Sequence, residues 1–163
     1  MKTIVYFIFP LLLVACACTK SAVKKLPPAT QTGANTFGCL INGMPFRATR
    51  ATPPGMSGLS DGTVSYSINL SYPGLFINVS PWERNSPIGI RINIPDFKGL
   101  GTYKDEEFLF NMLPVDPNTN SYVNITKHEN GILSGTFQAK VTYNNETYSI
   151  THGRFDIKDR FSN

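Results

Sequence analysis

Apolar and polar residues alternate with a period of two through most of the chain after Thr36, and no segment repeats with the 3.6 period of an amphipathic helix. The alternation is clearest over 64–71, 88–94 and 133–143. Shorter runs that also read as strands lie at 37–41, 44–46, 75–79, 122–127, 148–151 and 154–158. We therefore expect an all-β domain, an antiparallel β-sandwich or barrel of about 8–10 strands.

Dipeptides that tolerate a positive φ mark the expected turns. Asn42-Gly43 is the strongest hairpin signal, and Asn130-Gly131, Asn144-Asn145 and His152-Gly153 are further turn predictions. Pro45 follows the first of these turns. Because proline has no N–H to donate, it places its strand at the edge of a sheet.

Two positions inside expected strands are unusual. Gly135 falls on the apolar face of the 133–143 strand, which indicates a β-bulge or the close approach of another backbone. The segment 107–113 is apolar on both faces. It fits either a buried strand or a pair of helical turns, and the strand is the favoured prediction.

The N-terminus has the pattern of a secretion signal. Lys2 precedes an apolar stretch over 4–15, which is shorter than the roughly 20 residues that a membrane-spanning helix needs. An uncleaved anchor helix and a buried core segment are the alternatives. Leu13-Val14-Ala15-Cys16 then resembles the bacterial lipobox, which implies cleavage before Cys16 and lipidation of its thiol. Cys18 offers a second frame with a weaker match.

These features divide the chain into a signal peptide at 1–15, a lipidated tether at 16–35 and a single all-β domain at 36–163. The tether contains Pro27-Pro28 and has no apolar period, so we expect it to be flexible. Two or three acyl chains on the modified cysteine give firm anchoring to a membrane. By the same resemblance, Ala17 is not an inner-membrane retention signal and no acidic export cluster follows. The expected location is the bacterial outer membrane, with the periplasm-facing side favoured over surface exposure.

The basic surplus lies at the N-terminal end. The sequence has 15 Lys and Arg against 11 Asp and Glu, and four of the basic residues are Lys2, Lys20, Lys24 and Lys25. Without these four, 33–163 carries 11 basic and 11 acidic residues. A nucleic-acid-binding domain carries its basic surplus on its own surface, so nucleic acid is not an expected partner.

Cys18 and Cys39 remain if Cys16 is lipidated. An oxidising envelope allows a disulfide between them. Cys39 lies in an apolar run, however, and a buried small hydrophobe is its simpler role. Three cysteines without a C-x-x-C pair do not form a zinc framework.

No group of residues has the full pattern of a catalytic or metal site. His128 and His152 both fall at expected turns, and the elbow-like run 55–58 departs from G-x-S-x-G. The segment 116–120 copies the start of a calcium loop, but the loop's sixth and twelfth positions lack the required Gly and Glu. Carboxylates at 105–107 read more simply as a solvated loop than as a glycosidase pair. We expect no enzyme activity, no cofactor and no metal.

Four segments together carry a resemblance to a known family: 26–33, 36–43, 133–137 and 150–157. They resemble small lipoproteins of Bacteroidetes-type bacteria, the domain of unknown function DUF6252. The resemblance covers both ends of the mature chain, while 48–120 is less distinctive. It implies an all-β lipoprotein of the bacterial envelope and no particular activity. An Asp is common in this family where His152 stands, so the resemblance gives this histidine no role.

Trp82 and Tyr72 are candidate ligand contacts, because both lie beside expected loops and a Trp ring can stack on a sugar. An aromatic residue at the rim or in the core is the simpler alternative for each. The expected function is a lipid-anchored cell-envelope protein, a non-catalytic binding or structural module for a glycan, a peptide or an envelope protein. An envelope hydrolase and a carrier of lipid or another small ligand are the alternatives, the latter favoured by a barrel with an apolar interior.

Overall fold

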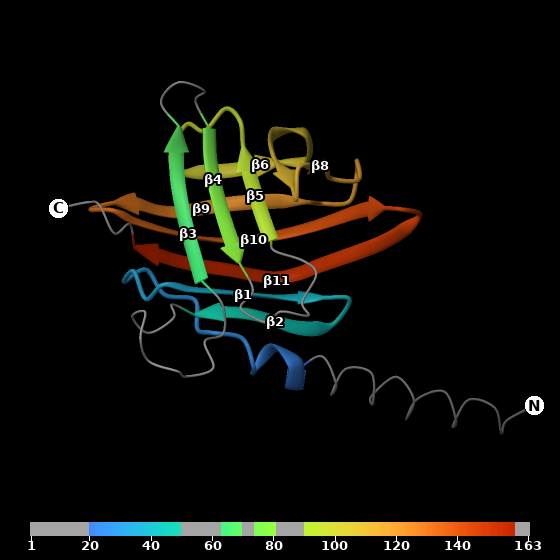
Figure 1. Ribbon diagram of the computed structural model, residues 1–163, viewed down its shortest axis with the longest axis horizontal. Coiled ribbons are helices and arrows are strands. Elements are labelled where there is room, and N and C mark those ends of the chain that lie inside the picture. The colour runs from blue at the N-terminus through green and yellow to red at the C-terminus, as the bar shows by residue number, and fades with distance from the viewer. Residues whose placement is uncertain (1–19, 50–62, 70–73, 81–89, 159–163) are drawn as a thin grey trace, which may run out of the picture.

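The computed structural model describes residues 20–49, 63–69, 74–80 and 90–158, and within them the fold is all-β (Figure 1). The strands form two antiparallel sheets that pack face to face, and neither sheet closes on itself. The expected sandwich is therefore confirmed, and the barrel alternative is not. The described residues contain eleven strands, slightly more than expected: the run 107–113 is split in two, β6 was not expected, and the runs 148–151 and 154–158 join into one strand.

The larger sheet has six strands and pairs the beginning of the domain with its end. Its order is β2 (Met44–Thr49), β1 (Thr36–Ile41), β11 (Glu146–Lys158), β10 (Ile132–Tyr143), β9 (Tyr122–Glu129) and β6 (Gly101–Lys104). Strand β2 lies at the edge, as Pro45 predicts. The strand β11 lies between β1 and β10 and is antiparallel to both.

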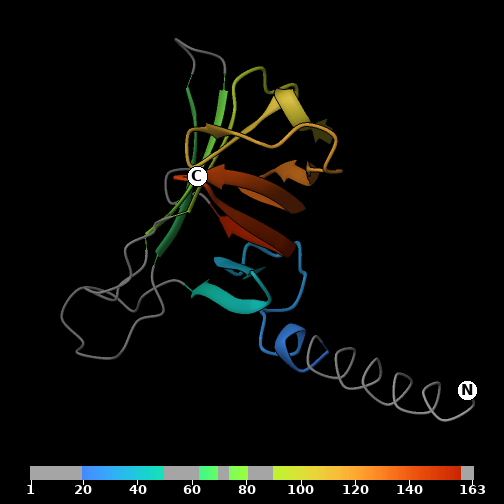
Figure 2. The same cartoon turned by 90° about the vertical axis from the view of Figure 1, so that its right-hand side faces the viewer.

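The smaller sheet has five strands and covers one face of the larger sheet. Its order is β3 (Thr63–Asn69), β4 (Gly74–Ser80), β5 (Ile90–Ile94), β7 (Leu109–Phe110) and β8 (Leu113–Pro114). The short 3₁₀ helix η1 (Asp105–Glu107) connects β6 in one sheet with β7 in the other. Figures 1 and 2 show that the strands of the two sheets cross rather than run side by side.

Apolar side chains from both sheets fill the space between them. All three inward-facing isoleucines of β5 are at most 2% exposed, as the alternation in this segment predicts. The ring of Phe137 lies at the centre, with centroid distances of 5.1 Å to Phe37, 6.4 Å to Phe110 and 6.3 Å to Phe155. These rings join the two sheets into one core.

Three of the expected turns form with both central residues at positive φ. The φ angles are 48° and 81° at Asn42-Gly43, 50° and 68° at Asn130-Gly131, and 50° and 63° at Asn144-Asn145. Two-residue turns of this kind match the right-handed twist of the strands that they join. The local sequence therefore determines three of the hairpins.

Gly135 combines both of the expected features. The register between β10 and β9 shifts at Ser134/Gly135, which is a bulge or a local irregularity in the ladder. A Cβ at this position would overlap the carbonyl oxygen of Asn124 and lie 2.6 Å from the ring of Phe155. No residue larger than glycine fits here without a shift of the backbone.

The turn expected at His152-Gly153 is wrong. Strand β11 continues through both residues, and the register shifts on both of its sides, opposite Phe137/Ala139 and Gly38/Leu40. His152 adopts a φ of 54° within this bulge. The bulge absorbs the extra residue, so the strand bends and continues instead of reversing.

The single strand favoured for 107–113 is also wrong. The segment begins in η1 and then forms the hairpin of β7 and β8, whose turn residues Asn111 and Met112 have φ angles of 53° and 65°. The side chain of Asn111 accepts a 2.7 Å hydrogen bond from the N–H of Arg91, which ties this turn to β5. The alternation of apolar and polar residues gives no indication of this long-range contact.

Candidate functional site

Residues 26–35, which we call the N-terminal strap, pack on the outer face of the six-stranded sheet. Leu26 is 7% exposed, and Pro27 lies so close to β1 that a Cβ on Gly38 would be 2.5 Å from its Cδ. Leu40, on the outer face of β1, is 1% exposed. The flexible tether expected over 16–35 is therefore wrong for this part, because the packed chain extends beyond β1 toward the N-terminus to at least Leu26. A segment without apolar period still packs here, because single apolar side chains and backbone donors find partners.

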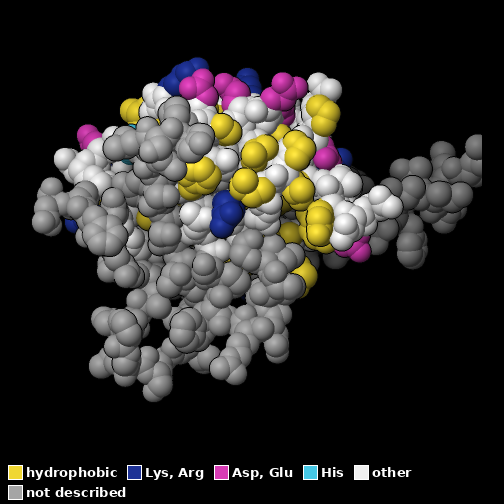
Figure 3. Space-filling model, turned by 45° about the horizontal axis from the view of Figure 1, so that its top comes forward, with side chains coloured by type: hydrophobic (Ala, Val, Ile, Leu, Met, Phe, Trp, Pro, Cys, Tyr) yellow, Lys and Arg dark blue, Asp and Glu magenta, His cyan; other side chains and the backbone are white. Residues whose placement is uncertain are grey.

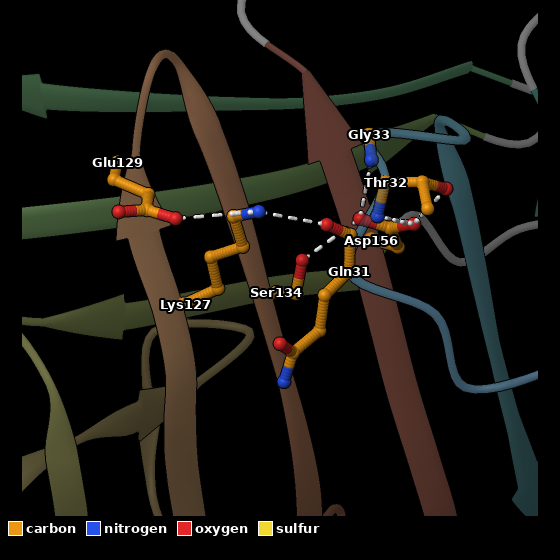
Figure 4. A network of polar contacts seen from close by, with 7 residues as sticks. All are labelled: Gln31, Thr32, Gly33, Lys127, Glu129, Ser134 and Asp156. Carbon is orange, nitrogen blue, oxygen red and sulfur yellow. Dashed lines mark hydrogen bonds and ion pairs between the residues drawn. The ribbon is translucent and has the colours of Figure 1, made fainter.

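The carboxylate of Asp156 fastens the strap to β11 (Figure 4). Asp156 is 1% exposed. Its oxygens accept hydrogen bonds from two types of donor, the backbone amides of the strap and the side-chain hydroxyl groups of Thr and Ser residues. The donors are Thr30 Oγ1 (2.6 Å), Thr32 N (3.0 Å), Thr32 Oγ1 (3.3 Å), Gly33 N (2.8 Å), Ala34 N (3.1 Å) and Ser134 Oγ (2.8 Å). Gly33, at a φ of 75°, turns the strap so that successive N–H groups face the same anion.

These donors set the ionisation of Asp156. Burial alone would raise its pKa, but the hydrogen bonds from Thr30, Ala34, Ser134 and Gly33 outweigh burial and lower the pKa to about 2. The group is therefore a carboxylate at every physiological pH. With its oxygens surrounded by protein donors, it has no lone pair directed at a substrate or a metal ion. Its chemistry is that of a structural anion.

Two further contacts hold the strap across neighbouring strands. Lys127 on β9 donates a 3.1 Å hydrogen bond from Nζ to the carbonyl of Gln31 and lies 3.4 Å from Glu129 (Figure 4). The side chain of Asn35 accepts a 3.0 Å hydrogen bond from the N–H of Lys158. The strap thus contacts β1, β9, β10 and β11, which makes it part of the sandwich.

Sequence reasoning did not identify Asp156 as a key residue, although a signal was present. An Asp between Phe155 and Ile157 places a charge inside an otherwise apolar strand, and a buried charge requires donors. All donors except Ala34 come from segments already singled out for their family resemblance: 26–33 contains Thr30, Thr32 and Gly33, and 133–137 contains Ser134, while 150–157 contains Asp156 itself. Three of the four segments meet at this one carboxylate.

Three residues with expected roles fall outside the described residues. They are Cys16, the expected lipidation site, and Tyr72 and Trp82, the candidate ligand contacts. In the chain, Tyr72 precedes β4 and Trp82 follows it, so the two are attached to opposite ends of one strand.

The residues tested for catalysis are dispersed. His128 is exposed on β9, with its ring 5.2 Å from that of Phe97, while His152 is exposed at the bulge of β11. Glu107 accepts a 2.7 Å hydrogen bond from the N–H of Lys104, which closes η1. Asp116 accepts a 3.0 Å hydrogen bond from Thr142. Over the described ranges, no three His, Cys, Asp or Glu side chains lie close enough to hold a metal ion.

Cys39 is fully buried in the core between the sheets. Burial raises the pKa of its thiol to about 12, so the thiol stays protonated. This placement fits the small buried hydrophobe, while Cys18, the partner of the alternative disulfide, lies outside the described residues.

The outer face of the five-stranded sheet carries a row of mostly apolar side chains. The paired positions Phe76, Asn93, Leu109 and Pro114 cross β4, β5, β7 and β8 in turn. We call these four residues the outer row. Asn93 is 7% exposed, and its Oδ1 has no hydrogen-bond partner among the residues that the structure describes. Beside the row, Arg91 donates a 2.8 Å hydrogen bond to Asn78. Figure 3 shows hydrophobic side chains gathered around a basic one on this side of the molecule.

The chain matches no protein-family model, and it has no significant match among curated proteins or solved structures. Among the residues that the structure describes, no helix is long and apolar enough to cross a membrane.

Proposed function

We propose that this protein is a lipid-anchored module of the bacterial cell envelope, held at the membrane by Cys16, that binds or supports another envelope component without catalysis. The strap carries this proposal. Because the buried carboxylate of Asp156 holds this N-terminal segment on the sheet, an anchor at Cys16 would keep the domain close to the membrane. The lipobox and the resemblance to small Bacteroidetes-type lipoproteins support an outer-membrane location on the periplasm-facing side.

Membrane fractionation tests the anchor. The wild-type chain should sediment with outer-membrane fragments, and Cys16→Ser should move it to the soluble fraction. Cys18→Ser is the matched control, and we expect it to leave the protein in the membrane. Release by the Cys18 variant, or retention of the Cys16 variant, would contradict the assignment of Cys16.

The outer row is the surface that we propose for the partner, a glycan, a peptide or an envelope protein. It lies on the sheet opposite the strap, and its apolar members Phe76, Leu109 and Pro114 are half-buried or exposed. Leu109→Ser should abolish capture of an envelope partner in a pull-down. Leu100→Ser, at a residue that is 65% exposed before β6, should not. Equal capture by both variants would exclude the outer row.

A further inference from the structure

The N-terminal part of the chain is basic and contains no acidic residue. All 11 Asp and Glu residues of the sequence occur from Asp61 onward. In the described stretch 20–49, the charged residues are Lys20, Lys24, Lys25 and Arg47. The domain has no overall surplus of charge, and every charged residue before Asp61 is basic.

The lysines project from a short helical turn that precedes the strap. Backbone bonds from Lys24 N to Lys20 O (3.3 Å) and from Leu26 N to Val23 O (3.1 Å) define this turn. Val23 is half-buried and Leu26 is buried, whereas all three lysines are exposed. The turn therefore rests its apolar side on the domain and presents its basic side outward.

The proposed anchor at Cys16 lies close to this basic side along the chain. Four peptide steps separate Cys16 from Lys20, which span at most about 14 Å. A flexible tether of twenty residues would allow the domain to move several times farther. Because hydrogen bonds to Asp156 hold the strap on the sheet, the linker between Cys16 and the domain ends at the helical turn and does not extend to β1.

We propose that the side formed by the helical turn and the edge strand β2 lies against an anionic phospholipid surface. In Figures 1 and 2 β2 is the strand nearest to this turn, and the β7–β8 hairpin is on the opposite side of the molecule. Met44, at the start of β2, is 73% exposed and faces the lipid, whereas Met112, in the β7–β8 turn, is 52% exposed and faces the aqueous compartment. The proposal rests on the proposed lipid anchor and specifies which face that anchor presents to the bilayer.

Site-specific spin labelling of the full lipidated chain tests this orientation. A nitroxide is attached to Met44→Cys or to Met112→Cys in a Cys18→Ser background, where acylated Cys16 and buried Cys39 do not react. The proteins are reconstituted into vesicles of phosphatidylglycerol and phosphatidylcholine that contain a nickel-chelating lipid. We expect the nickel-chelating lipid to enhance the spin relaxation of the nitroxide several-fold more at position 44 than at position 112. Equal enhancement at the two positions would overturn the proposal.

The lysines provide the matched comparison. Replacing Lys20, Lys24 and Lys25 by Gln should lower the affinity of this side for the anionic surface roughly fivefold per lysine, about a hundredfold in all. The difference in nickel-induced relaxation between the two labels should then disappear. Gln at the exposed Lys104, Lys140 and Lys158 should preserve it. A difference that survives the first triple substitution, or that persists in pure phosphatidylcholine, would refute the electrostatic contact. Failure of the wild-type chain to enter the vesicles at all would instead refute the lipid anchor.

Discussion

Replacing Asp156 by Asn should destabilise the fold and remove part of its sensitivity to acid. The pKa of this group is 3.8 in its ordinary state and about 2 in the folded protein. At about 1.4 kcal/mol per pKa unit, ionisation of Asp156 contributes about 2 kcal/mol to the free energy of unfolding at neutral pH. Asn removes the charge and directs an N–H₂ group at existing donors, which costs up to about 1 kcal/mol more. The expected loss is about 3 kcal/mol.

The direction of the pH effect follows from the lowered pKa. The unfolded chain takes up a proton on Asp156 near pH 4, while the folded chain resists until about pH 2. The stabilising contribution is therefore complete above pH 4 and disappears as the pH falls through this interval. Asp156→Asn should show a correspondingly smaller loss of stability between pH 4 and pH 2 than the wild type.

Urea unfolding followed by far-ultraviolet circular dichroism measures both effects. At pH 7 the midpoint of Asp156→Asn should fall by about 2 M, given a typical slope of about 1.5 kcal/mol per molar urea. Asp96→Asn is the control, because Asp96 is an exposed surface partner of Lys98 and should cost less than about 0.5 kcal/mol. An unchanged midpoint for Asp156→Asn, or an unchanged dependence on pH, would show that the strap is not held by this carboxylate.

Two further experiments test the packing of the core, one at Gly135 and one at Cys39. Gly135→Ala should lower the free energy of unfolding by about 3 kcal/mol or more in urea, because its Cβ would overlap the carbonyl of Asn124. Gly43→Ala is the control: the site is open at a φ of 81°, so the loss should be only about 1 kcal/mol. Equal losses would contradict the close approach at Gly135. The second test uses a chain with Cys16→Ser and Cys18→Ser, in which Cys39 is the remaining thiol. At pH 8 it should react with a thiol reagent only as fast as the protein unfolds, because Cys39 is buried and burial raises its pKa to about 12. Rapid labelling of the native protein would show that the thiol is accessible.

The strand pattern and the hairpins were predictable because they depend on local chemistry. Alternation in the β5 segment reports which side chains face the core, and Asn-Gly or Asn-Asn pairs report a positive φ at two successive residues. Gly135 was recognisable for the same reason, since a glycine on an apolar strand face leaves room for something else. These features need no knowledge of distant segments.

The errors arose where distant segments decide the outcome. His152-Gly153 has turn chemistry, but ladders with β1 and β10 resume beyond it and keep β11 continuous. Asn111 turns the chain because it bonds to Arg91 on β5. The strap has no local pattern at all and is ordered by Asp156, more than 120 positions away. Hydrogen bonds between remote residues leave almost no trace in periodicity or composition.

The place of β11 in the larger sheet limits the order in which this fold can be assembled. It is the last strand among the described residues, yet it separates β1 from β10 and carries the carboxylate that receives the strap. The β1–β2 hairpin and the strap therefore lack a docking surface until the chain as far as β11 is available. Contacts of such long sequence separation slow folding. A chain of this topology that emerges N-terminus first would thus carry the strap and the β1–β2 hairpin undocked until β11 arrives.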